Sequence, residues 1–349
     1  MKGLLKYLSP FAPDQSGAQA VFYDLGGIIV ISDAGGCTGN ICGFDEPRWF
    51  GQKSRIFSAG LRDMDAILGR DDKLVEKLKL ALSQVGGEFA AIIGTPVPAV
   101  TATDYRALKS LARKKTGMTI LAVECKGTAL YDEGAESAWE ELFDTFTKDD
   151  VKEAEDALGI IGMTPLDLSI THPEEFIEEL RQKEGFEKVL PYGMGAGLKE
   201  IERAGCVKRN LVVSPAGLKA ARKLKERFGT PYSMGFPFFK KAEKEAFLKA
   251  AGKKTLVIHQ QAAANEIRKM LTEADETSKV TCATWFKADK DFSSDKDLRF
   301  ETEEQFRDYV LNGDFDAIIG DPLFKRAIKE FKGIYIDAAH YAVSGYDGE

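Results

Sequence analysis

The stretch Ser16–Asn40 reads SGAQAVFYDLGGIIVISDAGGCTGN, and its pattern recurs along the whole chain. The apolar, β-branched run Gly27–Ser32 predicts a buried strand, and the glycine-rich segment after it predicts a turn. Similar runs are each followed by a Gly-, Pro- or Asp-containing turn and then by an amphipathic stretch. This alternation is typical of βαβ units, so we predict an α/β fold with parallel sheets.

The predicted strands fall into three sets, and 349 residues are too many for one ordinary core. We therefore predict three α/β domains: residues 1–150, 151–238 and 239–349. The charged stretch at 147–157 marks the first boundary. The strands predicted along the chain are Gly27–Ser32, Phe89–Gly94, Thr119–Glu124, Gly159–Gly162, Lys188–Pro191, Asn210–Ser214, Thr255–His259, Lys279–Ala283, Asp316–Gly320 and Gly333–Asp337.

Composition excludes several classes of protein. The chain is 44% hydrophobic and 30% charged, and no apolar run reaches the roughly 20 residues that cross a bilayer. The apolar stretch near the N-terminus is too short and too interrupted for a secretory signal. We therefore expect a cytoplasmic protein without membrane contact. The net charge of -7, with lysine and arginine interspersed among acids, argues against a nucleic-acid partner.

Five cysteines lie far apart in the chain, and in a cytosolic protein they are expected to be reduced. Any one of them alone reads as a small buried apolar side chain. Position separates them, because ligands of doubly wound sheets gather beyond the carboxyl ends of the strands. The residues predicted at such ends are Cys37, Cys125, Ser214, His259 and His340, whereas Cys206 and Cys282 are predicted to be structural.

The segment around Cys37 is unusually rich in glycine. Gly35, Gly36 and Gly39 allow the backbone to approach a bulky group and to point N–H groups at an anion. Thiolates hold iron–sulfur clusters, and amide hydrogen bonds to sulfur tune their potential. Taken alone, the pattern favours a tight turn packed against a neighbouring helix. Cys42 adds a C-x4-C spacing that matches no compact metal motif.

Cys125 repeats this topology, because it directly follows a predicted strand and is followed by Gly127. If both strands belong to one parallel sheet, their carboxyl ends share an edge and the two thiols are expected to converge. Two thiolates are half of the four that a cluster usually needs. A symmetric dimer would supply the other two, since a two-fold axis presents the same surface twice.

Taken together, the segments resemble the component 1 proteins of nitrogenase and nitrogenase-like enzymes, which receive electrons from an ATP-driven iron protein. The resemblance covers nearly the whole chain, and its ordered matches are specific as a set. They are SGAQAVFYDLGGIIVISDAGGCTGN (16–40), DAILGRDDKLVEKL (65–78), AAIIGTPVPAVTATDYRAL (90–108), ILAVECKGT (120–128), NLVVSPAGLKAARKLKERFGTPY (210–232) and IDAAHYAVSG (336–345).

The resemblance implies three Rossmann-like, doubly wound domains and a cluster at a subunit interface. Cys37 and Cys125 would be its ligands, with the four nearby glycines, Gly35, Gly36, Gly39 and Gly127, around it. It also implies docking of an iron protein that hydrolyses ATP. The chain contains no GxxxxGK[ST] phosphate loop, so the ATP chemistry is assigned to that partner.

The sequence departs from the family at two places. The segment SPFAPDQSGA lacks the cysteine that the family carries before its glycine-rich strand, which points away from a double cluster. A single four-iron cluster shared by two identical chains fits instead, with Cys42 and Asp14 as further candidate ligands. By resemblance, the family holds its cofactor with a cysteine and a histidine, which correspond here to Ser214 and His340. Only the histidine of these two ligands is therefore present. Dinitrogen reduction is therefore not expected.

These features lead to a hypothesis and two rivals. The hypothesis is a reductase that passes electrons through the cluster to a small unsaturated or tetrapyrrole-like substrate between domains, with His340 as a proton donor or metal ligand. A packing role for His340 fits the sequence equally well. The first rival is a non-catalytic scaffold or carrier for a metal cluster or metal complex. The second is a ligand-binding protein that keeps only the scaffold.

Overall fold

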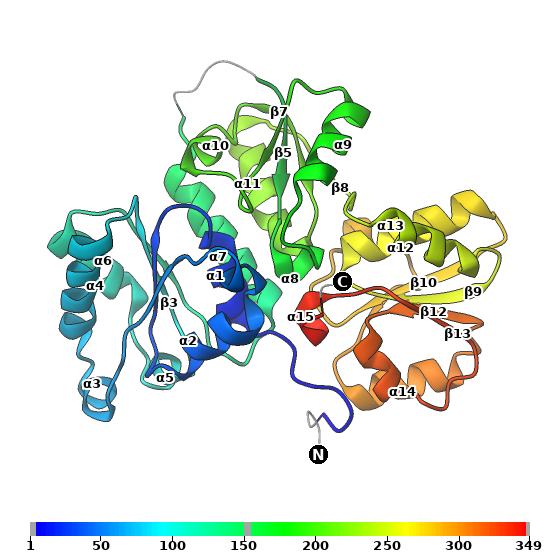
Figure 1. The fold of residues 1–349 in the computed structure, drawn as a ribbon, viewed down its shortest axis with the longest axis horizontal. Coiled ribbons are helices and arrows are strands. Elements are labelled where there is room, and N and C mark those ends of the chain that lie inside the picture. Colours follow the sequence, from blue (N-terminus) through cyan, green and yellow to red (C-terminus); the bar gives the residue numbers. More distant parts are fainter. Residues whose placement is uncertain (1–4, 150–154, 347–349) are drawn as a thin grey trace.

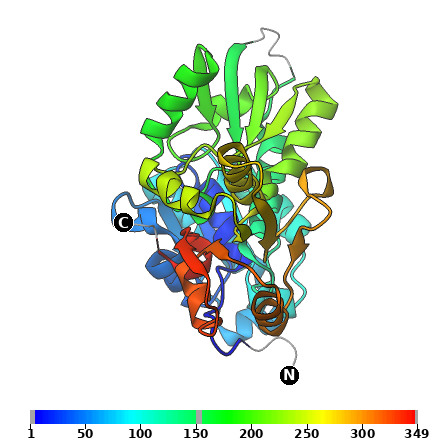
Figure 2. The ribbon, with the colours of Figure 1, turned by 90° about the vertical axis from the view of Figure 1, so that its right-hand side faces the viewer.

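The computed structural model describes residues 5–149 and 155–346, and it contains three parallel sheets, each from a different third of the chain (Figure 1). The second sheet lies above the junction of the other two in both views (Figures 1 and 2). Every pairing between named strands is parallel. The predicted fold class is confirmed.

The first sheet has the strand order β2-β1-β3-β4. Alternate residues of its inner strands face opposite layers: Ile29 and Ile31 pack with α1 and α7, while Ile28 and Val30 pack with α4 and α6. The elements are α1 (Asp14–Phe22), β1 (Ile28–Ile31), α2 (Gly36–Asn40), β2 (Arg55–Ser58), α3 (Asp63–Leu68), α4 (Asp71–Val85), β3 (Ala90–Ile93), α5 (Pro96–Val100), α6 (Tyr105–Thr116), β4 (Ile120–Val123) and α7 (Tyr131–Phe146).

The second sheet has the order β6-β5-β7-β8 and shares a core with the first. Helix α7 contacts α1 and β4 on one side and α10 and α11 on the other, so it lies between the two sheets (Figure 1). The elements are β5 (Glu155–Ile161), α8 (Pro165–Leu168), α9 (Glu174–Glu184), β6 (Lys188–Pro191), α10 (Leu198–Glu202), β7 (Val207–Val212), α11 (Leu218–Phe228) and β8 (Tyr232–Met234).

The third sheet has the order β11-β10-β9-β12-β13, with the chain reversing direction across the sheet between β9 and β12. Its core extends into the second unit through Phe236, Phe238 and Phe239. The elements are α12 (Lys241–Phe247), β9 (Lys254–Ile258), α13 (Gln261–Ala274), β10 (Lys279–Thr284), β11 (Leu298–Arg299), α14 (Glu303–Asn312), β12 (Ala317–Gly320), β13 (Ile334–Asp337) and α15 (Tyr341–Ser344).

All ten predicted strands are present, whereas three edge strands, β2, β8 and β11, were not predicted. The domain boundary predicted at 150/151 lies outside the described residues, and the boundary at 238/239 falls between β8 and α12 and stays a prediction. None of the described helices combines the length and the apolar character needed to cross a bilayer.

Candidate functional site

Cys37 lies beyond the carboxyl end of β1, in the first turn of the short helix α2. We predicted a tight turn at this position, and the structure instead has a short helix. The glycines permit this helix, which continues into a π-helical turn at Ile41–Asp45. The carboxylate of Asp33 anchors this segment by accepting hydrogen bonds from the Thr38 N–H (2.8 Å), the Thr38 hydroxyl (3.0 Å) and the Ser58 hydroxyl (2.6 Å). The cysteine is thus held by a defined local structure.

The space beside Cys37 is open. Its side chain is half-buried, and among the described residues no atom beyond the helix's own backbone and the chain neighbours lies within 4 Å of the position that a Cβ would take at Gly36 or Gly39. Gly35 adopts a φ of 120°, which a residue with a side chain rarely adopts. The glycines therefore shape the segment and leave room for a bulky group.

Cys125 directly follows β4 and is only 1% exposed. Burial raises the pKa of its thiol well above the usual value, and the carboxylates of Asp14 and Glu124 raise it further. Burial also raises the pKa values of Cys37 and Cys42. All three thiols are therefore protonated at neutral pH, and any of them must lose a proton before it can bind iron.

The end of β3 lies between the two predicted ligand cysteines. The Cys37 thiol hydrogen-bonds to the side chain of Thr95, and the backbone of Gly94 approaches Cys125 so closely that a Cβ there would lie 2.8 Å from the Cys125 nitrogen. Both cysteines thus flank one edge of the first sheet. Within the described part of a single chain, no three His, Cys, Asp or Glu side chains lie close enough together to hold a metal ion.

His340 lies at the junction of the three units and is 1% exposed. Its ring stacks on His259 with centroids 4.5 Å apart and an interplanar angle of 13°. Nε2 of His340 lies 3.1 Å from the Tyr131 hydroxyl, and the ring also hydrogen-bonds to the Leu166 backbone. Burial and the neighbouring His259 lower the pKa of His340 well below its usual value, so the imidazole is neutral.

A buried network connects His340 to Ser214. Tyr131 donates to Oδ1 of Asp167 (2.8 Å), and Asp167 also hydrogen-bonds to the side chains of Thr164 and Ser214. Burial raises the pKa of Asp167 to about 6. The two positions that correspond by resemblance to cofactor ligands are therefore joined through packed side chains, which does not fit a resident metal cofactor between them.

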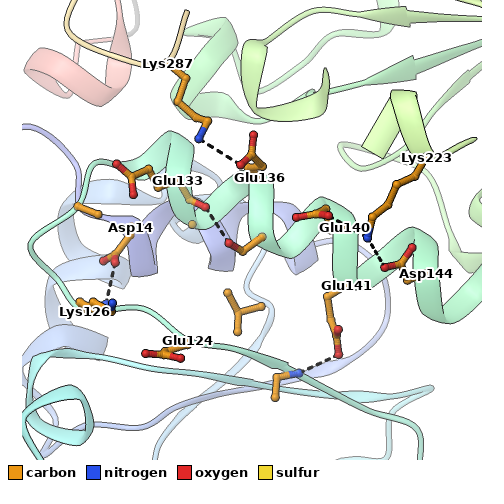
Figure 3. Close-up of a pocket in the computed structure, with 15 residues that line it drawn as sticks. Asp14, Glu124, Lys126, Glu133, Glu136, Glu140, Glu141, Asp144, Lys223 and Lys287 are labelled. Atoms are coloured by element: carbon orange, nitrogen blue, oxygen red, sulfur yellow. Dashed lines mark hydrogen bonds and ion pairs between the residues drawn. The ribbon is translucent and has the colours of Figure 1, made fainter. Parts of the chain in front are cut away.

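Two large cavities lie at the surface. The first, of about 560 Å³, is an acidic groove along α7 beside β4 (Figure 3). Most of its carboxylates are paired, such as Glu136 with Lys287 (3.1 Å) and Glu140 with Lys223 (2.9 Å). Within the described chain, Glu124 and Glu133, at the Cys125 end of the groove, form no ion pair. This end of the groove therefore disfavours a thiolate at Cys125.

The second cavity, of about 610 Å³, is a cleft between the first and second units. Pro47, Arg48 and Gly51 line one side, and His172 and Met194 line the other. Its volume lies in the range of small-molecule sites. The Arg48 guanidinium is already engaged, because it pairs with Glu46 and Asp24 and donates to the Ala20 carbonyl.

Comparison with known proteins identifies the family to which this architecture belongs. The model of the family described as "Nitrogenase component 1 type Oxidoreductase" matches residues 15–286. The chain belongs to this family. No match was found among curated proteins.

Solved structures show the same fold at low identity. The structure titled "Nitrogenase Cp1 at pH 6.5" superposes with a TM-score of 0.75 at 10% identity, covering 100% of this chain and 88% of that chain. The structure titled "Nitrogenase Cp1 at pH 5" gives a TM-score of 0.70 at 12% identity, covering 98% and 85%. The family thus confirms the resemblance seen in the sequence.

The structure also reveals residues that sequence reasoning missed. Tyr131, Asp167 and Asp33 were not singled out, although Tyr131 contacts His340, Asp167 contacts Ser214, and Asp33 holds the helix that carries Cys37. Their partners lie up to 209 positions away in the sequence. The one available signal was the position of Asp33, which lies just beyond the carboxyl end of β1.

Proposed function

We propose that this chain is the cluster-bearing subunit of a nitrogenase-like reductase in the cytoplasm. Two identical chains would share one 4Fe–4S cluster, each supplying Cys37 and Cys125, and an ATP-dependent iron protein would supply the electrons. The observation that carries this proposal is the placement of both cysteines at the carboxyl edge of the first sheet, in a chain of the nitrogenase component 1 family.

An apolar rim around this edge supports association of two chains. Phe44, Ile67 and Val100 are 72%, 72% and 87% exposed, and each lies on a segment that follows β1, β2 or β3. Exposed apolar side chains that gather on one face mark interaction surfaces. A second copy of the chain would cover them and would complete the set of four thiolates.

The donor set fits half of a cluster. Cys37 is accessible and lies beside open space, whereas Cys125 becomes a ligand only when its thiol loses a proton and is exposed. When bound, the cluster would supply one-electron transfer. Asp33 would orient the Cys37 helix, and Cys42 stays the further candidate ligand on the same segment.

Residues of this chain would also transfer protons during the reaction. His340 keeps a neutral imidazole and reaches the Tyr131 hydroxyl, which in turn reaches Asp167. We place His340 on the proton route as a relay, because a neutral imidazole can accept a proton at one ring nitrogen while it gives one up at the other, and each electron added to a bond generally needs a proton. A small unsaturated or tetrapyrrole-like substrate would bind in the 610 Å³ cleft between the first and second units.

A second candidate function is a scaffold or carrier for a metal cluster or metal complex. The closed, protonated state of Cys125 favours it, because such a thiol suits temporary loading. Turnover separates the two functions. A reductase couples ATP-driven reduction of its cluster by an iron protein to substrate reduction, whereas a carrier releases its metal group to another protein.

The experiment is anaerobic reconstitution with iron and sulfide, followed by metal analysis, electron paramagnetic resonance and sedimentation. Wild type should bind about four irons per dimer. Cys37→Ala/Cys125→Ala should bind almost none, and the matched control Cys282→Ala, at a buried cysteine in β10, should load like wild type. A fully loaded double variant would refute the ligand assignment.

A further inference from the structure

Helix α1 is buried along its whole length, and it contacts both segments that carry the proposed ligands. All nine residues, from Asp14 to Phe22, are buried. The polar ones among them are unusual for such a place, because burying a polar group is unfavourable unless it finds a hydrogen-bond partner. Their partners show what this helix does.

Asp14 braces the loop that follows Cys125. Its Oδ2 accepts a hydrogen bond from the Lys126 N–H (2.7 Å), and its Oδ1 accepts one from the Gly127 N–H (2.8 Å). Its own N–H donates to the Ala129 carbonyl (3.1 Å). The first residues after the cysteine are thus fixed to the start of α1, as the contact between Asp14 and Lys126 shows in Figure 3.

The same turn of α1 also holds the segment that follows Cys37. The Ser16 hydroxyl donates to Oδ2 of Asp45 (2.7 Å), an atom that also accepts a hydrogen bond from the Asn40 amide (2.8 Å). Asn40 ends the helix that carries Cys37, and Asp45 ends the π-helical turn after it. Ser16 therefore acts on the Cys37 segment as Asp14 acts on the Cys125 loop.

We propose that Asp14 and Ser16 are positioning residues that hold the Cys125 loop and the Cys37 segment in a fixed arrangement at the sheet edge. The inference rests on the proposed function, in which these cysteines are ligands. It assigns Asp14 the role of a brace and not that of a ligand, because both carboxylate oxygens already accept backbone N–H groups. The segment before the first strand thus contributes geometry where the family resemblance expects a cysteine.

The test uses the full chain without its cluster, so that its outcome does not depend on iron. In Asp14→Asn, amide hydrogen exchange should become at least about tenfold faster at Lys126 or at Gly127, whichever N–H then faces the side-chain NH2 group, because one of the two acceptor oxygens is lost. Exchange in β4, at Leu121 and Val123, should stay as in wild type. Asp14→Glu, which keeps the charge but displaces the carboxylate, should show the same local loss if Asp14→Asn does not fold.

Labelling of cysteine provides a second measurement. Cys125 should react with a thiol reagent at least about tenfold faster in Asp14→Asn, while the buried Cys282 serves as an internal standard for global unfolding. Glu124→Gln is the matched control, because it also removes a nearby negative charge that raises the pKa of Cys125 but leaves the brace intact.

The outcomes separate the two proposals. Unchanged exchange at Lys126 and Gly127, or a Cys125 rate in Asp14→Asn no higher than in Glu124→Gln, would overturn the brace. Faster local exchange together with an unchanged melting temperature supports it. If wild type never binds iron, the proposed function fails, whereas these results on the cluster-free protein stand.

Discussion

At the scale of single residues, His259 shows how the buried junction of the three units favours the neutral form of an imidazole. Its Nδ1 accepts the Gln260 N–H (2.9 Å), and its Nε2 lies 3.0 Å from the Ala339 carbonyl, so one ring nitrogen is an acceptor and the other a donor. A second proton on Nδ1 would face an N–H group. Burial lowers the pKa of His259 to about 4.

This shift predicts a loss of stability in acid. In the unfolded chain the pKa of a histidine is about 6.5, so the unfolded state binds the proton first as the pH falls. The contribution of His259 is complete above about pH 6.5 and declines by about 1.4 kcal/mol per pH unit towards pH 4. Urea unfolding across this range should show that His259→Gln loses less stability in acid than wild type.

The control for this measurement is His172→Gln, which removes an imidazole at an exposed turn outside the junction. If wild type and His259→Gln give parallel curves between pH 6.5 and 4, the imidazole is not held neutral by the fold.

The sequence predicted where single residues lie relative to the strands better than it predicted their hydrogen-bond partners. Cys37 and Cys125 could be placed because the strand that precedes each is a clear apolar run. Asp14 gave no comparable signal as a brace, because its partners, Lys126 and Gly127, are 112 and 113 positions away. A contact of that kind follows from the packing of α1 on α7, which no local pattern encodes.

At the scale of elements, the crossing of α1 and α7 depends on two glycines. A Cβ at Gly17 would collide with the carbonyl oxygen of Tyr131, and a Cβ at Gly134 would collide with the carbonyl oxygen of Asp14. Each helix thus uses a glycine to approach the backbone of the other. This close approach brings Asp14 within reach of the loop that precedes α7.

Gly134→Ala should therefore destabilise the protein by about 3 kcal/mol or more, because the clash is with backbone and cannot be relieved by turning a side chain. Urea unfolding would measure the loss. Gly43→Ala is the matched control, since no atom of another described segment lies within 4 Å of a Cβ there, and it should change stability by less than about 1 kcal/mol. Equal effects of the two substitutions would refute the crossing as described.

The elements that escaped prediction have a shared physical reason. Strands β2, β8 and β11 each form the edge of a sheet and are only partly buried, so they lack the apolar run of a buried strand. Helix α1 is buried on every side, so it shows no amphipathic pattern. The hydrophobic pattern of a sequence identifies helices with one solvent-exposed face and strands that form a continuous apolar run. The three edge strands and α1 show neither pattern.

At the scale of the whole molecule, the three sheets are joined by shared cores, by surface ion pairs such as Glu136–Lys287, and by a buried polar junction. Apolar side chains of the second and third units form one cluster, and Leu8 and Phe11 of the N-terminal segment pack on the third unit. At the junction, Tyr131 comes from α7, Asp167 from the second unit and His340 from the third. One hydroxyl therefore connects residues from all three units.

Tyr131→Phe tests this connection, because it removes the hydroxyl and keeps the ring, which also packs against Phe286. His340 Nε2 would lose the partner described here, while Asp167 would keep Thr164 and Ser214. An unsatisfied buried group costs about 1–3 kcal/mol, and urea unfolding should show a loss of this size. The control is Tyr309→Phe, whose hydroxyl makes no hydrogen bond within the described chain and whose ring keeps its contacts with Phe300 and Phe315. If both substitutions cost the same, the Tyr131 hydroxyl does not help to hold the three units together, and the proton route through Tyr131 loses its structural basis.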